Sequence, residues 1–129
     1  MKKLLILLSV LFSLVFSPPS YSEWKEVSKS LSGTTFYVDY ERIKKRGDYT
    51  FYWQLADYVK PSPNGSVSSK VYSKVDCNLF RYKFLSDWYY KKQMGQGEAH
   101  SSSTTPDEDW NYPHPDSSLE YILESVCSW

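Results

Sequence analysis

The sequence has few of the side chains that build metal and catalytic sites. Its 129 residues include only two cysteines, Cys77 and Cys127, and two histidines, His100 and His114. A four-ligand zinc site would need all four of these side chains, which lie far apart in the sequence. The G-x-S-x-G motif of serine hydrolases and the H-E-x-x-H motif of zinc proteases are also missing. We therefore expect no catalytic residue, no metal site, no cofactor and no enzymatic activity.

The sequence also has no excess of basic over acidic residues. Lysine plus arginine and aspartate plus glutamate number 15 each. Two of the lysines lie within the first three residues, so loss of the N-terminal segment described next leaves 13 basic against 15 acidic residues, a formal charge of −2. Nucleic-acid-binding domains carry a basic footprint. The charge balance therefore argues against a nucleic-acid partner.

The sequence also lacks an apolar run long enough to cross a membrane. The N-terminal run Leu4–Phe16 has about 13 residues, whereas a spanning helix needs roughly 20. Two lysines precede this run and small residues follow at Ser20 and Ser22, which is the layout of a secretory signal peptide cleaved before Glu23. No cysteine for lipid attachment lies near that cleavage site. We expect residues 1–22 to be a signal peptide and the product to be periplasmic or secreted, without a transmembrane anchor.

The remaining chain, residues 23–129, is short enough for one domain and is rich in aromatic side chains. Alternation of apolar and polar residues with period two, which is typical of half-buried strands, recurs along most of it. Tyrosine and valine also favour strands. The fold class that we expect is α+β, with an antiparallel β-sheet of five to six strands packed by one C-terminal α-helix and tied by a single disulfide. The predicted strands lie within residues 23–30, 34–40, 49–59, 66–80 and 81–92, with a charged turn around Gly47 before the third. Tyr49, Phe51, Trp53 and Leu55 share one face of the third strand, and Cys77 and Leu79 share the valine face of the fourth.

The closing helix is predicted at residues 116–127. Ser117 and Glu120 form a capping box, in which the hydroxyl accepts from an early backbone N–H and the carboxylate reaches back. Cys127 follows Leu123 by four residues and therefore lies on the same face of the helix. This apolar face is formed by Leu119, Ile122, Leu123 and Val126.

The two cysteines are predicted to form a disulfide. Cys77 shares a strand face with Val71 and Val75, and Cys127 lies on the apolar face of the helix. Export places both side chains in an oxidising compartment, where disulfides persist. A bond that closes a loop of about 50 residues would stabilise the domain by roughly 4 kcal/mol at most. The residues alone leave two free thiols or a metal-binding pair as alternatives.

Several polar residues are candidates for weaker roles. Residues 97–111 are predicted to form a long flexible loop, because they are polar and rich in serine and threonine. Their acidic cluster, residues 107–109, lacks the ligand spacing of a calcium loop. His100 and His114 are expected to be surface side chains without a task. The strand-end aspartates Asp39, Asp57 and Asp76 are expected to cap turns, with the paired carboxylates of a glycosidase as the alternative.

The best candidate for a partner-binding site is the segment RYKFLSDWYYKK at residues 81–92. If its aromatic side chains face the core, it is an ordinary strand with a basic outer surface. If it extends beyond the sheet, its end becomes a partly exposed aromatic patch beside two lysines. Tryptophan, tyrosine and arginine dominate protein interfaces, and lysines can steer an acidic partner. The predicted partner-binding residues are Trp88, Tyr89, Tyr90, Lys91 and Lys92.

A family resemblance is carried by several short motifs in a fixed order from Trp24 to Cys127. They are FYVDYERI, WQLADY, VDC, MGQG and a final VC. This series resembles the surface-adhesin protein E-like family of bacterial exported proteins. The resemblance implies an antiparallel sheet packed by a C-terminal helix and tied by a Cys77–Cys127 disulfide. It also implies a role in binding, since the founding adhesin attaches bacteria to host extracellular proteins.

We therefore expect an exported, non-enzymatic, adhesin-like protein that binds extracellular or envelope proteins, with a host extracellular matrix protein as the partner class. One alternative is a periplasmic inhibitor of a host hydrolase such as lysozyme, in which the loop SSTTPDED would enter the active-site cleft. Another is an envelope housekeeping protein, and a third is a weak hydrolase built on the strand-end aspartates. Homodimerisation through exposed strand edges is also compatible with the sequence.

Overall fold

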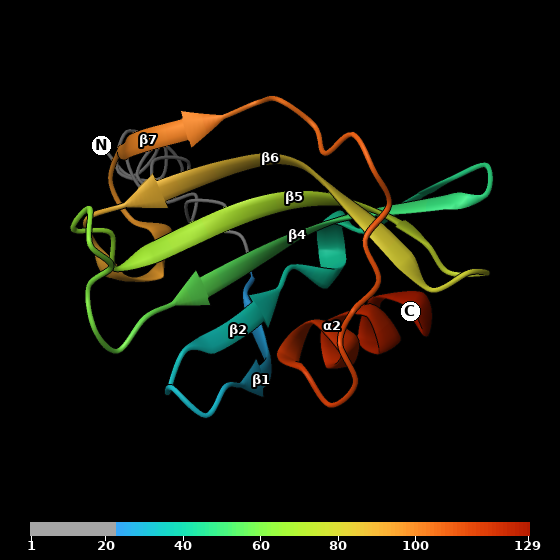
Figure 1. The fold of residues 1–129 in the computed structure, drawn as a ribbon, viewed down its shortest axis with the longest axis horizontal. Helices are drawn as coiled ribbons and strands as arrows, with labels where there is room; N and C mark the ends of the chain where they lie inside the picture. The colour runs from blue at the N-terminus through green and yellow to red at the C-terminus, as the bar shows by residue number, and fades with distance from the viewer. Residues whose placement is uncertain (1–22) are drawn as a thin grey trace, which may run out of the picture.

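The computed structural model describes residues 23–129, so the predicted signal peptide lies outside the described residues. The chain forms one antiparallel seven-stranded sheet in the order β1-β2-β4-β5-β6-β7, with β3 paired to β4 beside this path, and a C-terminal helix (Figure 1). The predicted α+β fold is confirmed. The elements are β1 (Lys25–Lys29), β2 (Thr35–Val38), η1 (Tyr40–Arg42), β3 (Lys44–Arg46), β4 (Tyr49–Asp57), β5 (Ser68–Asp76), β6 (Arg81–Tyr90), η2 (Gln93–Gly95), β7 (Ala99–Ser103) and α2 (Ser118–Cys127).

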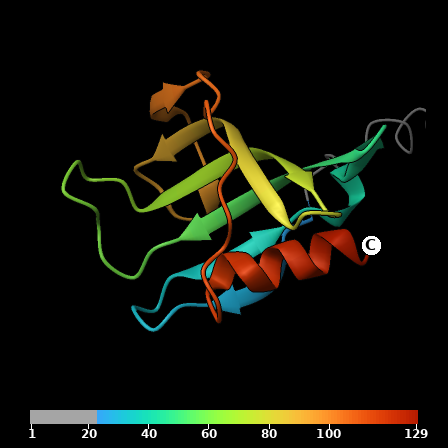
Figure 2. The same cartoon turned by 45° about the vertical axis from the view of Figure 1, so that its right-hand side comes forward.

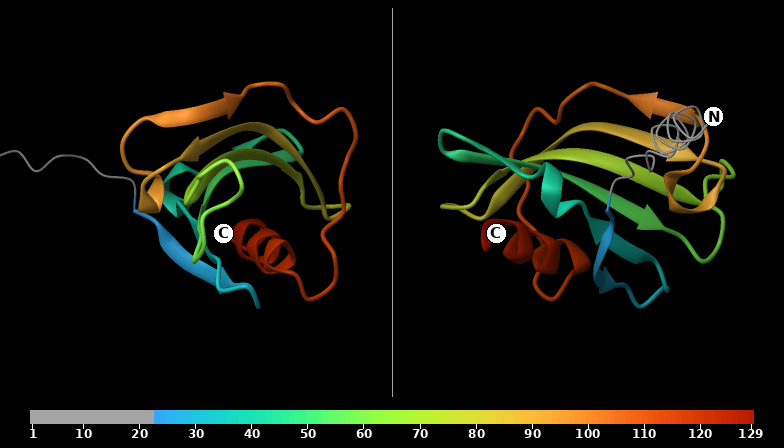
Figure 3. Two further views of the ribbon diagram at one scale, coloured as in Figure 1. Left: turned by 60° about the vertical axis from the view of Figure 1, so that its left-hand side comes forward. Right: turned by 180° about the vertical axis from the view of Figure 1, so that it is seen from behind.

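Helix α2 covers one face of the sheet. Figure 2 shows it running beneath the strands, and Figure 3 shows the sheet curving around it. Ile122, Leu123 and Val126 of the predicted helix face are fully buried, and the partly buried Leu119 packs against them. No helix within residues 23–129 is long and apolar enough to cross a membrane. The buried cluster between helix and sheet consists of Val38, Tyr52, Val75, Ile122, Leu123 and Val126.

The start of α2 follows the predicted capping box with one difference. Ser117 is the N-cap, and its hydroxyl accepts a hydrogen bond of 3.2 Å from the backbone N–H of Glu120. The carboxylate of Glu120 reaches back to the backbone N–H of Asp116, one residue before the cap. Both interactions satisfy N–H groups that the first helical turn would otherwise leave unpaired. The helix therefore begins where the sequence places it.

The predicted disulfide is confirmed. Cys77 and Cys127 are bonded, with their Cα atoms 5.7 Å apart and 50 residues apart in sequence. Both half-cystines pack against the buried cluster, so each lies on the apolar side of its own element. The bond joins the end of α2 to the turn after β5. It therefore fixes α2 to the face of the sheet that this helix covers.

The prediction of a long flexible loop at residues 97–111 is wrong. Residues Ala99–Ser103 form β7, which pairs with β6. Beyond it, the backbone N–H of Asp107 donates to the carbonyl of Phe84, and Asn111 exchanges two hydrogen bonds with Tyr82. A strand edge needs partners for its N–H and C=O groups, and these polar residues supply them through their backbone and through the carboxylate of Asp107, which accepts from the N–H of Phe84.

Two smaller expectations also change. The charged segment around Gly47, expected as a turn only, contains the short strand β3, which pairs with β4. Leu79, expected on the buried face beside Cys77, lies in the turn between β5 and β6 and is 57% exposed. The turn begins directly after Asp76, whose carboxylate accepts from the backbone N–H groups of Asn78 and Leu79.

The MGQG motif forms a turn that packs on the side of the sheet opposite α2. Met94 has a left-handed backbone conformation with φ of 56°, and its N–H donates to the carboxylate of Asp57. The hydroxyl of Ser68 accepts from the N–H of Gly95 and donates to the carbonyl of Lys92. The turn therefore covers one end of that side by hydrogen bonds to two strands.

We expect Gly95→Ala to destabilise the fold more than Gly65→Ala. Both glycines have positive φ, 62° and 84°, so alanine carries backbone strain of about 1–2 kcal/mol at either position. A Cβ at Gly95 would also lie 3.1 Å from the Leu55 side chain and overlap Lys70, whereas a Cβ at Gly65 meets nothing within 4 Å. Urea unfolding should show an additional loss of about 1 kcal/mol or more for Gly95→Ala. Equal losses would contradict this account of the turn.

Candidate functional site

The candidate site lies on the side of the sheet that faces away from α2, which we call the outer face. In β4 the residues Thr50, Tyr52 and Gln54 are buried beneath the helix side, while Phe51 and Trp53 alternate with them and are half-buried on the outer face. The aromatic face that the sequence indicates in this strand is therefore the one that α2 does not cover. Aromatic and basic side chains gather there from β4, β5 and β6.

A bulge in β6 decides which of its aromatic residues join the outer face. The pairing of β5 with β6 shifts register between Tyr72 and Ser73. Before the shift, Tyr82 and Phe84 pair with residues on the helix side and pack on each other with ring centroids 5.0 Å apart. After it, Trp88 pairs with Lys70 on the outer face. The extra residue thus turns Trp88 away from the core, as bulges commonly redirect side chains.

Trp53 lies at the centre of the outer face. Its ring stacks on Tyr72 with centroids 4.9 Å apart and contacts Trp88 at 5.2 Å. The guanidinium of Arg42 lies 5.3 Å from the Trp53 ring and 5.7 Å from the Trp24 ring, where the negative ring faces attract it. Arg42 is itself held by the buried carboxylate of Asp39 at 2.6 Å. These contacts hold the rings of Trp53, Tyr72 and Trp88 and the Arg42 guanidinium against one another.

A second aromatic group lies at the other end of the outer face, around Trp110. Trp110 stacks on Tyr49 with centroids 5.6 Å apart. Three cations surround its ring, with Arg81 at 4.4 Å, Lys83 at 5.2 Å and Lys74 at 5.7 Å. We call Lys74, Arg81, Lys83 and Trp110 the basic cluster. Trp110 follows the segment that pairs with β6, so the non-local pairing of that segment positions it.

Burial and neighbouring charges shift the pKa values of several groups on the outer face. Burial, and then the positive charge of Arg42, lowers the pKa of Lys70. The hydrogen bond from the N–H of Leu79, together with the Arg81 guanidinium, lowers the pKa of Asp76. Burial raises the pKa of Tyr90. A lowered pKa is expected for a lysine that is partly shielded from water and lies near another positive charge.

The five residues predicted to bind a partner do not form a single patch. Trp88 and Tyr90 lie on the outer face, but Tyr90 is only 8% exposed, beneath the ammonium of Lys70 at 5.1 Å. Tyr89, between them, points to the opposite side of β6. Lys91 and Lys92 are exposed in the turn that follows. The structure therefore places Trp88 on the outer face and the two lysines in the turn beyond β6, and it separates Tyr89 from Trp88.

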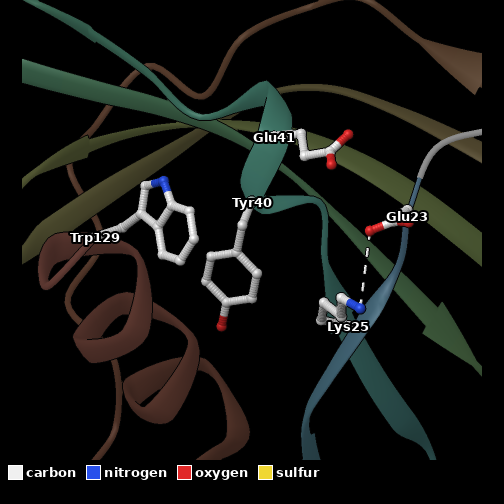
Figure 4. Close-up of a pocket in the computed structure, with 5 residues that line it drawn as sticks. All are labelled: Glu23, Lys25, Tyr40, Glu41 and Trp129. Atoms are coloured by element: carbon white, nitrogen blue, oxygen red, sulfur yellow. Dashed lines mark ion pairs between the residues drawn. The ribbon is translucent and has the colours of Figure 1, made fainter.

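A cavity of about 430 Å³ opens at a different place, between the N-terminal part of the described chain and the end of α2 (Figure 4). Tyr40 and Trp129 form its apolar wall with ring centroids 4.8 Å apart. Glu23, Lys25 and Glu41 line the rest, and Glu23 pairs with Lys25 at 3.8 Å. The volume suits a small ligand or one side chain. The residues around its opening carry charges of both signs, so the cavity favours neither an anionic nor a cationic ligand.

The aspartates considered as catalytic groups all make structural contacts. Asp39 pairs with Arg42, and Asp76 pairs with Arg81 at 3.0 Å. Asp57 accepts from the backbone N–H of Met94. Within residues 23–129, no three His, Cys, Asp or Glu side chains are grouped as metal ligands would be.

His100 is exposed, as expected, and its side chain makes one structural contact. Its Nε2 atom lies 2.8 Å from the hydroxyl of Ser66, which is fully buried. This hydrogen bond joins β7 to the loop that precedes β5. His114 contributes its backbone carbonyl, which accepts from the hydroxyl of Ser117 at the start of α2.

The comparison with known families decides the classification. The model of the family described as surface-adhesin protein E matches residues 24–128, which is most of the chain. The chain belongs to the surface-adhesin protein E family. Membership makes it an exported protein of a surface-adhesin type. No curated protein sequence matches it.

Solved structures of protein E from Haemophilus influenzae share the fold of this family member. Crystal form II is 18% identical, with a TM-score of 0.63 over 88% of this chain and 94% of that one. A second structure of the same protein is 19% identical, with a TM-score of 0.60 over 88% and 91%. The protein from a non-typeable strain is 17% identical, with a TM-score of 0.53 over 87% and 80%. At these identities the similarity concerns the fold, and the side chains of the outer face must be judged by their own chemistry.

Proposed function

We propose that this protein is a non-enzymatic, adhesin-like binding protein that engages a protein partner through the outer face of its sheet. One observation carries the placement: α2 does not cover the outer face, which presents Tyr72 and Trp88 packed against the ring of Trp53. Aromatic residues held in fixed conformations contribute contact area at low entropic cost and dominate interface energies. Membership of a surface-adhesin family supports binding as the task.

The partner class that we propose is a host extracellular matrix protein, with a protein of the bacterial envelope as the second candidate. Within the outer face, Trp88 would be the apolar anchor, and Lys91 and Lys92 would attract acidic groups of the partner during encounter. Tyr90 is buried, so it supports the position of Lys70 rather than touching the partner. Tyr89 lies on the other side of β6 and would contribute only at its edge.

We expect Trp88→Leu combined with Lys91→Ala and Lys92→Ala to weaken partner capture about tenfold or more, because it removes an aromatic anchor and two steering charges. The measurement is a pull-down with the oxidised protein against a panel of matrix proteins and an envelope extract, followed by titration of the partner recovered. The matched control is Tyr121→Ala with Lys29→Ala and Lys60→Ala, which removes an exposed aromatic residue of α2 and two exposed lysines elsewhere.

The control variant should bind like the wild type. Capture of envelope components alone would replace the adhesin role with an envelope role at the same surface. Equal binding by the triple variant and the wild type would contradict the placement at Trp88. Circular dichroism of each variant would show that the fold is retained.

A further inference from the structure

The basic cluster contains an arrangement that costs stability. Lys74 of β5 and Lys83 of β6 are direct cross-strand partners, and both are half-buried on the outer face. Like charges directly opposite each other in a sheet repel. In the same row across the sheet lie Phe51 of β4, paired with Lys74, and Lys44 of β3, paired with Phe51. Three lysines therefore cross the outer face in one line, with an aromatic ring among them.

These lysines have no carboxylate partner. In the described part of the chain, the ion pairs within 4 Å are Lys25–Glu23, Arg42–Asp39 and Arg81–Asp76. The ammonium of Lys83 donates to the backbone carbonyl of Glu108, and that of Lys74 lies 4.0 Å from the Tyr49 ring centroid. The nearby Asp107 carboxylate is occupied by the N–H of Phe84 and the amide of Asn111. Within residues 23–129, neither Lys74 nor Lys83 therefore forms an ion pair with a carboxylate inside 4 Å.

We propose that the basic cluster is a binding site for an anionic polysaccharide, whose sulfate or carboxylate groups contact Lys74 and Lys83 while its sugar rings lie along the aromatic side chains beside these lysines. The net charge of residues 23–129 is negative, so the concentration of lysines in one row is a local feature and complements a linear anion. The weakly positive C–H groups of a sugar are attracted to the negative faces of aromatic rings such as Phe51 and Tyr72. This site goes beyond the proposed protein-binding function and does not depend on it.

A sugar chain fits this surface better than an acidic peptide does. Peptides that bind sheets commonly add as a strand to an open edge, where backbone N–H and C=O groups are free. The basic cluster lies over β4, β5 and β6, and the backbone groups of the inner strands β4 and β5 are paired on both sides. A ligand there must rely on side-chain charges and ring faces. A polysaccharide meets both requirements, because its anionic groups repeat along the chain and the C–H faces of its sugar rings can pack on aromatic rings.

The test compares a heparin-derived octasaccharide, poly-L-glutamate and inorganic sulfate as probes of the oxidised protein, by isothermal titration calorimetry at low and at physiological salt. The proposal expects the octasaccharide to bind more tightly than the other two probes, with an affinity that falls as salt rises. Lys74→Gln with Lys83→Gln should weaken octasaccharide binding about tenfold or more, because two charge-assisted contacts are removed. Trp110→Leu should also weaken it.

The matched control is Lys29→Gln with Lys60→Gln, which removes the same charge from exposed positions outside the cluster. It should bind the octasaccharide like the wild type, and near-UV circular dichroism should show that both double variants keep their tertiary packing. Absence of octasaccharide binding, or an equal loss in the two double variants, would overturn the proposal. Tighter binding of poly-L-glutamate would assign the site to an acidic peptide instead. The outcome of the protein-binding test at Trp88 does not depend on these results, because that test changes other residues.

Discussion

Cys77→Ala with Cys127→Ala is expected to lower the free energy of unfolding by about 4 kcal/mol. The bond closes a loop of 50 residues, and its removal frees the unfolded chain to explore many more conformations. A domain of this size has a total stability of roughly 5–15 kcal/mol, so the loss is a large share. Helix α2 has only 10 residues and cannot persist alone, so its docking should weaken together with the sheet.

The measurement is urea unfolding followed by tryptophan fluorescence, comparing the oxidised protein, the protein with reductant and the double variant. The midpoint should fall by about 2 M urea or more in the last two samples. The reduced wild type serves as the control, because it loses the bond without losing a side chain. Coincident unfolding curves for all three samples would contradict a stabilising role for the bond.

Leu123→Ala is expected to destabilise the domain by about 3 kcal/mol. Leu123 is fully buried between α2 and the sheet, so truncation removes apolar contact and leaves a cavity that the surrounding strands cannot fill. Within residues 23–129, α2 is the one α-helix, so no second helix can move into the gap. Denaturant unfolding of the oxidised variant measures the loss directly.

Tyr121→Ala provides the matched control for this core substitution. Tyr121 lies in the same helix but is 47% exposed. Its truncation should change the free energy of unfolding by less than about 1 kcal/mol. Comparable losses at the two positions would show that α2 does not dock through the face containing Leu123.

The helix could be predicted from the sequence because its capping residues and apolar stripe are local signals. The disulfide could be predicted because each cysteine lies on the apolar face of its own segment. The capping residues precede an apolar stripe of period 3.6, and Cys127 falls on that stripe. Cys77 falls on the valine face of β5, which is buried at Val75. Because the sequence has two cysteines, a disulfide within the chain can join only Cys77 to Cys127.

The outer face could be predicted only in part. Period two identified an aromatic face in β4, but it could not tell which face the helix covers, because both carry large side chains. In β6 the adjacent apolar residues Phe84 and Leu85 break the alternation, and this was the only local sign of the bulge that turns Trp88 outward.

The basic cluster could not be predicted from the sequence because its members come from distant segments. Trp110 reaches the cluster because the polar stretch before it pairs with β6 through backbone hydrogen bonds, which side-chain pattern does not reveal. The cross-strand pairing of Lys74 and Lys83 depends on the exact register of β5 and β6. A shift of one residue would place either lysine on the opposite face.

The central claim, that the outer face is the binding surface, is tested most directly by the indole N–H signals of the tryptophans. In a ¹⁵N–¹H spectrum each tryptophan gives one such signal, and Trp53 and Trp88 report the outer face whereas Trp129 reports the cavity beside Tyr40. Addition of the protein partner recovered in the pull-down should shift or broaden the signals of Trp53 and Trp88 and leave that of Trp129 unchanged. A shift confined to Trp129 would contradict the account, because it would place binding at the cavity instead of the sheet.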